Sequence, residues 1–263
     1  MNHAQLLNLY DQHQRVNIEY PGARKEVLPG IVRFVRPAPG MNFIAYSRLD
    51  PALADAAIQA QVDYFRPMGQ PFEWIVYEHD SPPDLLDRLA AHGFEISETE
   101  PILTLSLREV PPALLAPVSA DVRRITTRAG LEDVITVMER VYGGNFGWIR
   151  QRLGDHLEIP GYLSVYAAYV DEQPACAGWI YYHPRDYQGS SARLFAGLWG
   201  GSTVEEQRGK GLYTAILTRR VQEAIQRDYH YLYINASSMS EPIVRKHGFQ
   251  LLARMRACEW QRQ

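Results

Sequence analysis

The sequence has 263 residues and a mass of 30.0 kDa, a length that fits two small domains of roughly 100–150 residues each. Hydrophobic residues make up 46% and charged residues 22%, and no stretch approaches the roughly 18–20 consecutive apolar residues of a membrane span. These values exclude a disordered, collagenous or membrane-spanning chain. The 27 Lys and Arg against 30 Asp and Glu leave a net charge of −3, which argues against nucleic acid as a main partner.

Two features indicate a cytoplasmic protein. Cys176 and Cys258 are too few for a disulfide framework, and both fit the role of small hydrophobic residues better than that of catalytic thiols. The first residues, MNHAQLLNLYDQHQ, are polar and acidic where a secretory signal has an apolar run. We therefore expect a reduced, cytoplasmic protein that does not associate with membranes.

The first half of the chain predicts the order strand, helix, strand, helix. The predicted strands cover 42–48 and 72–77, and the predicted helices cover 51–66 and 83–92. Gly93-Phe94 follows the second helix, as is common where a glycine ends a helix, and one more strand is expected over 102–107.

A proline-rich segment, 109–117, separates the two halves. Proline removes a backbone donor and fixes φ, so three prolines in nine residues favour a linker over the interior of a helix or strand. We expect a domain boundary near residue 117, with one domain over 1–117 and a second over 118–263.

The second half predicts more elements, and two acidic residues and a glutamine at 171–173 form the turn of a hairpin. Its expected strands and helices are, in chain order, a strand at 122–126, helices at 131–142 and 148–157, strands at 164–170, 174–182 and 194–204, a helix at 211–229, a strand at 231–235, a helix at 242–247 and a strand at 251–260.

The order strand, helix, strand, helix, Gly-Phe therefore occurs in both halves. The tripeptide His92-Gly93-Phe94 also matches His247-Gly248-Phe249. A shared His-Gly-Phe is weak on its own, and the shared order of elements is the stronger observation. We interpret the chain as an internal duplication.

The loop before the long helix of the second half carries the chemistry. Gly209 and Gly211 allow an anion to approach the backbone, and the helix that follows presents N–H groups and a favourable dipole. Arg208 and Lys210 add positive charge. From these residues alone, a pyrophosphate site and a simple flexible turn are both acceptable interpretations.

The wider context favours the pyrophosphate. The order strand, Arg-Gly-Lys-Gly, amphipathic helix, strand, short helix, Gly-Phe, strand resembles the core of the Gcn5-related N-acetyltransferase (GNAT) family over roughly residues 120–260. The resemblance implies a mixed α/β (α+β) fold, here two GNAT-like halves with a mostly antiparallel sheet flanked by helices. It also implies that acetyl-CoA is the co-substrate and that no metal is needed. One departure is Tyr213, which stands where the family has Gly or Ala.

The resemblance also implies which residues bind the coenzyme. The end of the preceding strand would bind the pantetheine amides through unpaired backbone groups, and the loop amides would hold the diphosphate. An N–H near Thr203 or Val204 would polarise the thioester carbonyl. The expected cofactor-binding residues are Ser202, Thr203, Val204, Arg208, Gly209, Lys210, Gly211, Leu212 and Tyr213.

The catalytic acid and base are not identified by the sequence. Many members of the family place a tyrosine four residues before the glycine of Gly-Phe, but Val244 occupies that position here, and the strand at 194–204 has no carboxylate. Ser240, a candidate acid, is also a natural helix cap, and His183, a candidate base, is also an ordinary hairpin histidine. Both assignments stay open.

The acceptor is expected to be the primary amine of a small molecule, which attacks the thioester carbon of acetyl-CoA directly. Aromatic side chains suited to an apolar amine, or to an ordinary core, are Tyr142, Phe146, Trp148, Trp179, Tyr181 and Tyr187. Two other functions are compatible with the resemblance, namely an acyl-CoA-binding or sensing module without turnover and an aminoacyl or long-acyl transferase. We expect a monomer or a homodimer.

The first half resembles the degenerate half of a tandem GNAT protein. Only Leu49-Asp50 separates its first predicted strand from its helix, and Asp50 places a negative charge where a phosphate site needs amides and a cation. Each half also has one good strand after its Gly-Phe pair. We therefore expect the first half not to bind CoA, and each half to be completed in part by the other.

Overall fold

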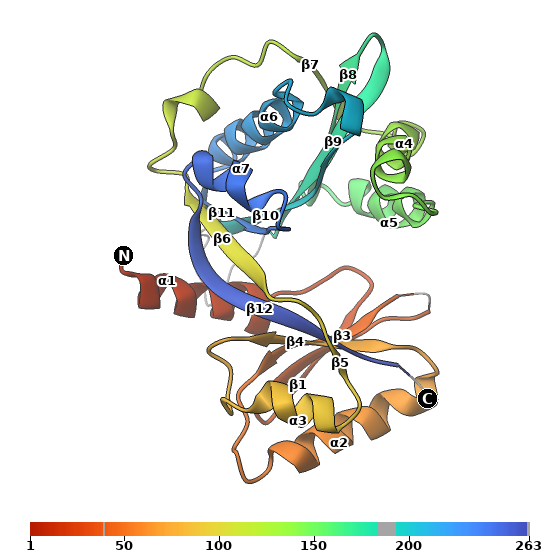
Figure 1. Cartoon of the computed structure of the whole chain (residues 1–263), viewed down its shortest axis with the longest axis vertical. Helices are drawn as coiled ribbons and strands as arrows, with labels where there is room; N and C mark the ends of the chain where they lie inside the picture. Colours follow the sequence, from red (N-terminus) through yellow and green to blue (C-terminus); the bar gives the residue numbers. More distant parts are fainter. Residues whose placement is uncertain (39, 184–192, 262–263) are drawn as a thin grey trace. The chain divides into compact units, whose positions relative to one another are not determined.

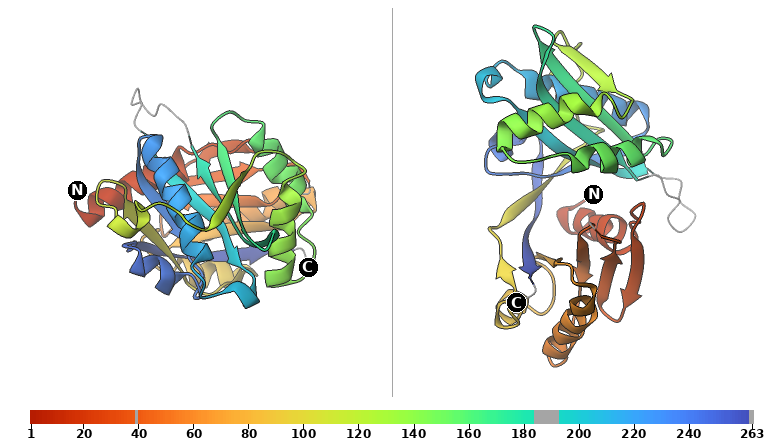
Figure 2. Two further views of the ribbon diagram at one scale, coloured as in Figure 1. Left: turned by 90° about the horizontal axis from the view of Figure 1, so that it is seen from above. Right: turned by 90° about the vertical axis from the view of Figure 1, so that its right-hand side faces the viewer.

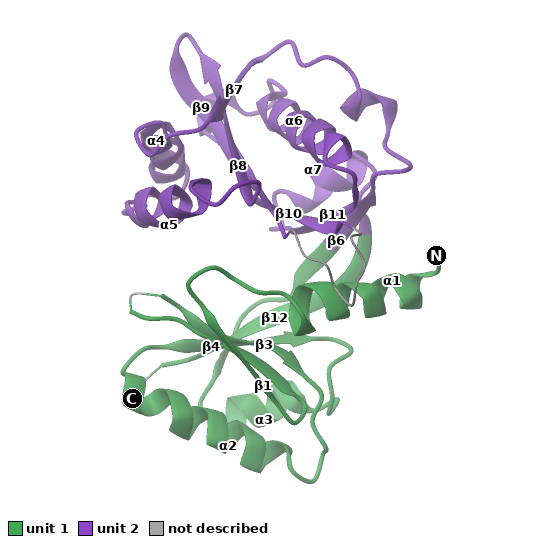
Figure 3. Cartoon of the chain, turned by 180° about the vertical axis from the view of Figure 1, so that it is seen from behind, with its two compact units in different colours: residues 1–102, 251–263 green, residues 103–250 purple. Residues whose placement is uncertain are grey.

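The computed structural model describes residues 1–38, 40–183 and 193–261, which form a mixed α/β fold. The chain divides into two compact units, shown in Figure 3. Unit 1 contains Met1–Ile102 and Leu251–Gln263, and unit 2 contains Leu103–Gln250. Both units are built as a sheet with helices against it.

The sheet of unit 1 has the strand order β1-β2-β3-β4-β12, with the short β5 paired to β12. The β3–β4 pair is parallel and the other registered pairs are antiparallel. The strands are β1 (Arg24–Leu28), β2 (Ile31–Val35), β3 (Asn42–Ser47), β4 (Phe72–Tyr77), β5 (Glu95–Ile96) and β12 (Gln250–Trp260), and β6 (Glu100–Ser106) begins in this unit.

Helices α2 and α3 of unit 1 bury an aromatic core. Phe65 of α2 stacks on Phe72 of β4 with ring centroids 4.4 Å apart, and Trp74 is fully buried beside them. The helices are α1 (His3–Tyr10), a π-helical turn (Asp11–Val16), α2 (Ala54–Phe65), a 3₁₀ turn (Arg66–Met68) and α3 (Leu85–Ala91).

The sheet of unit 2 has the order β6-β11-β10-β9-β8-β7. It is mostly antiparallel, but β10 and β11 run parallel. Asp171 and Glu172 both have positive φ, which gives β8 and β9 a tight two-residue turn. The strands, after β6, are β7 (Asp121–Ile125), β8 (Leu163–Val170), β9 (Gln173–Tyr182), β10 (Arg193–Thr203) and β11 (Tyr229–Asn235).

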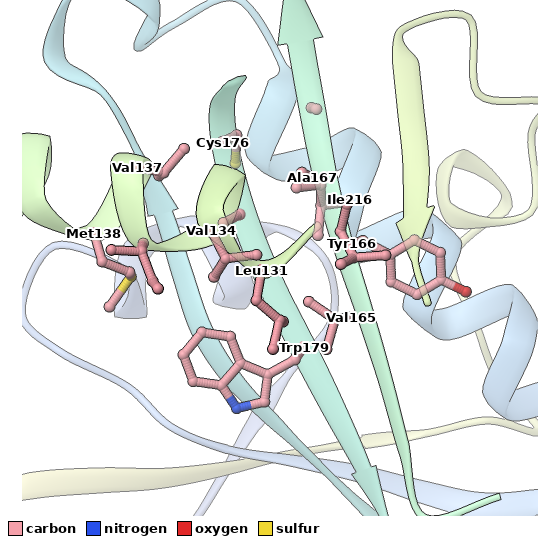
Figure 4. Packing of buried hydrophobic residues seen from close by; sticks show 14 of the residues in the cluster. Leu131, Val134, Val137, Met138, Val165, Tyr166, Ala167, Cys176, Trp179 and Ile216 are labelled. Carbon is pink, nitrogen blue, oxygen red and sulfur yellow. The ribbon is translucent and has the colours of Figure 1, made fainter. Parts of the chain in front are cut away.

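Helix α6 lies on one face of this sheet, and α4 and α5 lie on the other (Figures 1 and 2). Leu131, Val134 and Met138 of α4 point toward Val165 and Trp179 of the sheet in Figure 4, as their helical spacing predicts. The helices are a 3₁₀ turn (Pro112–Leu114), α4 (Leu131–Tyr142), α5 (Trp148–Leu157), a 3₁₀ turn (Glu205–Gln207), α6 (Leu212–Gln226) and α7 (Glu241–Lys246).

The expected repeat is present in the structure. β3-α2-β4-α3 in unit 1 and β10-α6-β11-α7 in unit 2 each join two parallel strands through a helix. The ends also agree in detail. Gly93 and Gly248 have φ of 85° and 89°, and the N–H of the following phenylalanine bonds to Leu89 O in one unit and to Val244 O in the other.

The division into units differs from the boundary expected near residue 117 in two ways. The proline segment is not a free linker, because Leu114 is buried and Gln222 of α6 donates to the carbonyls of Leu114 and Ala116. The C-terminal strand also belongs to unit 1, because β12 pairs with β4 from Trp260↔Phe72 to Met255↔Tyr77. The two halves thus exchange strands, since β6 from the first half joins the sheet of unit 2.

This exchange predicts that unit 1 depends on the end of the chain. Truncation after Gln250 removes Cys258 and Trp260 from the core of unit 1 and leaves one edge of β4 unpaired. We expect the β4 amides to lose protection in hydrogen exchange by more than about 10-fold, or roughly 1.4 kcal/mol of opening free energy. A chain that ends after Trp260 is the control. Unchanged protection of β4 after the longer truncation would contradict this role of β12.

Candidate functional site

Strand β10 leaves its parallel neighbour before it ends. The β10–β11 register stops at Leu198↔Ile234, while β10 continues to Thr203 and pairs there, within the described part of the chain, with β9 alone. The last residues of β10 therefore have an open edge. Backbone groups on such an edge need another partner, and a ligand can supply it.

A glycine bulge accompanies the divergence. The β10–β9 register shifts between Trp199 and Ser202, and Gly200 has φ of +63°, a conformation that L side chains rarely adopt. A Cβ on Gly200 would lie 1.9 Å from Cζ3 of Trp179, and a Cβ on Gly201 would lie 2.7 Å from Cε2 of Tyr213. Both glycines are therefore required by close neighbours.

The ladder with β9 decides which N–H groups at the end of β10 are available. The N–H of Val204 donates to Ala175 O at 2.9 Å, so it is not free to polarise a thioester, and that half of the expectation is wrong. Directions alternate along an antiparallel strand, so the N–H of Thr203 points to the open edge. The carbonyl of Thr203 already accepts a bond from Arg208 Nε at 3.2 Å.

The loop after β10 forms a concave run of backbone donors. Gly209 and Gly211 have φ of +76° and +79°, and α6 starts at Leu212 without a side-chain cap. No acceptor for the N–H groups of residues 209–214 is found in the described part of the chain. Successive free N–H groups at a helix N-terminus create a positive electrostatic site that suits a phosphate.

A pocket of about 430 Å³ joins the open edge to this loop. Its walls come from the end of α4, the end of β10, the loop, the first turn of α6 and the segment before α7. The expected site residues that line it are Ser202, Thr203, Arg208, Gly209, Gly211, Leu212, Tyr213 and Ser240. Val204 is buried behind it, and Lys210 lies outside it with Nζ 2.8 Å from Gln207 Oε1.

Comparison with known proteins identifies the fold. No protein-family model and no curated protein matches the sequence. Among solved structures, a GCN5-related N-acetyltransferase from Kribbella flavida matches with a TM-score of 0.70 at 15% identity, over 97% of this chain and 94% of that one. The chain has the GNAT fold.

Two further structures agree. A tandem GNAT protein from the clavulanic acid biosynthesis pathway matches with a TM-score of 0.57 at 14% identity, over 98% of this chain and 94% of that one. A putative acetyltransferase of the GNAT family from Novosphingobium aromaticivorans gives a TM-score of 0.53 at 16% identity, with 91% of both chains covered. Because these matches cover nearly the whole of this chain, both units belong to the GNAT-like fold.

The candidate acid Ser240 lies at the pocket, but its hydroxyl is occupied. Ser240 precedes α7, and its Oγ contacts Ser237 O and Ser237 Oγ at 3.3 and 3.2 Å. The phenol of Tyr142 also lines the pocket, and its Oη lies 3.0 Å from Ser202 Oγ. A tyrosine from α4 therefore lines this pocket, whereas Val244, at the position where the resemblance expects a tyrosine, is buried on α7.

The candidate base His183 is not at the pocket. It follows β9 at the end opposite Thr203, since Tyr182 pairs with Ala196 whereas Cys176 pairs with Thr203. Along a strand, these positions are on the order of 20 Å apart. His183 packs on the rings of Tyr162 and Tyr181.

The aromatic residues proposed for an acceptor pocket are also dispersed. Trp179 is buried beneath Gly200, and Tyr181 bonds to His156 Nδ1 at 2.8 Å. Tyr142, Phe146 and Trp148 form a chain of neighbouring rings at the end of α4 and the start of α5. Tyr187 lies outside the described residues.

The cysteines are structural. Cys176 is buried beside Thr203, whose Oγ1 donates to its sulfur at 3.1 Å, and Cys258 is buried in unit 1. Burial raises the pKa of the Cys176 thiol to about 11 and that of Cys258 to about 12, so neither forms a thiolate readily. Within the described residues, no group of His, Cys, Asp and Glu is arranged to hold a metal ion, and no helix is long and apolar enough to cross a membrane.

Two residues at the site were not anticipated from the sequence. The sequence indicates Tyr142 only as a wall of an acceptor pocket, and the loop motif does not include Arg220. Arg220 lies on the buried stripe of α6, four residues after Ile216, and a charged residue on an apolar stripe is the signal that could have identified it.

The environment of His183 predicts a pH dependence of stability. Burial, together with the charge of His156, lowers the pKa of His183 from 6.5 to about 4. The unfolded chain therefore binds a proton that the folded chain excludes, and the free energy of unfolding falls as pH drops from about 6.5 to about 4. We expect His183→Phe to flatten this slope in denaturant titrations across that range. His3→Gln, at an exposed position, is the control, and an equal slope in H183F would contradict the expectation.

Proposed function

We propose that the chain is an acetyl-CoA-dependent N-acetyltransferase that acetylates the primary amine of a small molecule. The observation that carries the proposal is the run of N–H groups at residues 209–214, which find no acceptor among the described residues and lie where β10 diverges from β11 in a GNAT fold. A diphosphate fits this run, because it offers several negatively charged acceptors at the spacing of successive amides.

The pantetheine arm would follow the open edge of β10. The N–H of Thr203 is directed to that edge, and Ser202 and Thr203 line the pocket. An amide of the arm that bonds there continues the ladder that β11 interrupts. This arrangement puts the thioester near the bulge at Gly200-Gly201, where the backbone can polarise the carbonyl as the amine attacks.

Unit 1 has the same topology without these binding features. The last β3–β4 register pair is Ile44↔Trp74. Just beyond it, the carbonyl of Ala45 accepts a bond from Arg15 Nε at 2.9 Å, and the N–H of Tyr77 donates to Asp80 at 3.0 Å. Asp50 in turn accepts the N–H of Ala52 in the turn before α2. Because side chains of unit 1 already form hydrogen bonds with these backbone groups, we infer that unit 1 does not bind CoA.

Proton transfer needs a donor for the departing thiolate of CoA. A phenol, with an ordinary pKa near 10, is a stronger acid than the alkyl hydroxyl of a serine. Tyr142, Tyr213 and Ser240 all line the pocket, but the hydroxyl of Tyr213 is buried, so Tyr142 carries the accessible phenol. We assign the acid role to Tyr142, because the Ser240 hydroxyl contacts Ser237 and does not cap α7. This assignment leaves the base to water or to the acceptor itself.

Coenzyme binding is tested at the loop. We expect Arg208→Glu with Gly211→Asp to weaken CoA binding by at least about 100-fold, or roughly 2.7 kcal/mol, because the pair adds bulk and negative charge where the diphosphate lies. Isothermal titration with CoA and with acetyl-CoA measures this loss. The matched control is Arg219→Glu, which changes the charge of α6 at an exposed position away from the loop.

An amine panel read by thiol release then tests turnover. Binding of acetyl-CoA without transfer to any amine would favour a sensing module, and transfer from longer acyl-CoA alone would favour a long-acyl transferase. At an acetyl-CoA concentration of about 100 times the expected dissociation constant, binding should stabilise the folded wild-type protein by roughly 2.7 kcal/mol. No thermal stabilisation under these conditions would contradict all three functions.

The acid assignment predicts a contrast between two conservative variants. We expect Tyr142→Phe to lower kcat about 10- to 100-fold with acetyl-CoA affinity within about 3-fold of wild type, because only the proton donor is lost. Ser240→Ala is expected to change kcat less than about 3-fold. Stopped-flow thiol release measures both. Equal losses in the two variants would remove the distinction between Tyr142 and Ser240.

A further inference from the structure

Arg220 is a fully buried cation beneath the bulge of β10. It projects from α6, and its relative exposure is 0%. Its Nη1 donates to the carbonyls of Trp179 and Trp199 at 3.2 and 3.3 Å. Gly178 makes room for it, because a Cβ there would lie 3.1 Å from Nη1.

The guanidinium has no counter-ion in the described part of the chain. Nε and Nη2 are buried without a hydrogen-bond partner, and no ion pair of Arg220 is found among residues 1–38, 40–183 and 193–261. The polar groups around it are the phenol of Tyr213, outside standard hydrogen-bond geometry, and the side chains of Cys176 and Tyr182. All three are neutral, so the charge is uncompensated.

Arg15 of unit 1 shows how the same chain treats a buried arginine with a structural role. Arg15 is 1% exposed, and each of its nitrogens has a partner. Nε donates to Ala45 O, Nη1 to Asp11 and Nη2 to Asp80, at 2.9, 3.0 and 2.6 Å. Arg220 lacks both carboxylates, although an uncompensated buried charge is costly to keep.

The place of Arg220 connects its charge to the reaction. Trp179 and Trp199 are register partners, and theirs is the last pair before the bulge. The bond to Trp199 O polarises the peptide that links Trp199 to Gly200, because carbonyl and N–H of one peptide unit polarise together. In an interior of low dielectric, the charge also raises the positive potential along the bulge.

We propose that Arg220 is a positioning residue for acyl transfer, which acts through the peptide backbone of the β10 bulge to stabilise the negative charge that develops on the thioester oxygen. The inference rests on the proposed function, since it needs acetyl-CoA at the bulge. Arg220 does not touch the substrate. A methionine in the stripe of Ile216, Val221 and Ala224 would pack there without the cost of a buried charge, so the arginine is explained by the reaction and not by packing.

The test measures the carbonyl itself. Difference infrared spectra of isotope-labelled acetyl-CoA bound to the protein report how strongly the carbonyl is polarised, without an acceptor and without turnover. We expect a shift to lower frequency in the wild type and a smaller shift in Arg220→Met, with acetyl-CoA affinity within about 3-fold. Where an acceptor is known, kcat is expected to fall about 10- to 100-fold at nearly unchanged KM. Arg220→Lys restores the charge and is expected to recover part of both signals.

Controls separate this role from a structural one. Arg219→Met removes a charge from an exposed position of the same helix and is expected to leave the carbonyl shift unchanged. If R220M does not fold, Arg220→Gln, which keeps an N–H donor without the charge, replaces it. A folded neutral variant with the full wild-type shift overturns the inference alone. Wild-type protein that binds no acetyl-CoA overturns the proposed function, and the inference with it.

Discussion

The site depends on one interruption of a hydrogen-bond ladder. β10 and β11 pair as far as Leu198↔Ile234, and beyond that point, among the described strands, β10 pairs with β9 alone. A sheet normally saturates its backbone, so an open edge next to a pocket is a constraint that other residues must maintain. The bulge at Gly200 bends the strand away, and the loop that follows turns its N–H groups into the opening.

Complementary pairs of residues keep this interruption in place. The ring of Trp179 occupies the space that a Cβ on Gly200 would need, and the ring of Tyr213 occupies the space that a Cβ on Gly201 would need. Tyr213 departs from the Gly or Ala of the GNAT loop, and the glycine opposite provides the volume that the larger side chain takes. The larger side chain at Tyr213 is therefore accommodated by the absence of a side chain at Gly201 of β10, as close packing of interiors requires.

Local sequence patterns predicted the helices and strands more completely than they predicted the contacts between distant side chains. Apolar periodicity gave helices at 131–142 and 148–157 with the bounds that α4 and α5 have. It did not predict α1 or β1, because α1 buries only Tyr10 and β1 alternates weakly between exposed and half-buried positions. It also missed β2, whose buried residues are continuous and include Arg33, so they show no alternation. The loop residues were predictable because they are contiguous. The bond from Tyr142 to Ser202 joins residues 60 positions apart, and no local pattern encodes it.

The two units share one topology but differ in the features that a binding site needs. Both contain the same strand-helix-strand-helix arrangement, and both place a buried arginine near the point where the parallel pair ends. In unit 1, Asp11 and Asp80 neutralise Arg15. The arginine also donates a hydrogen bond to a backbone carbonyl just beyond the last β3–β4 pair. In unit 2, the described residues supply neither a counter-ion for Arg220 nor acceptors for the loop amides. One topology therefore occurs in two states: unit 1 satisfies these backbone groups and its buried charge with its own side chains, and unit 2, where we propose that the coenzyme binds, does not among the described residues.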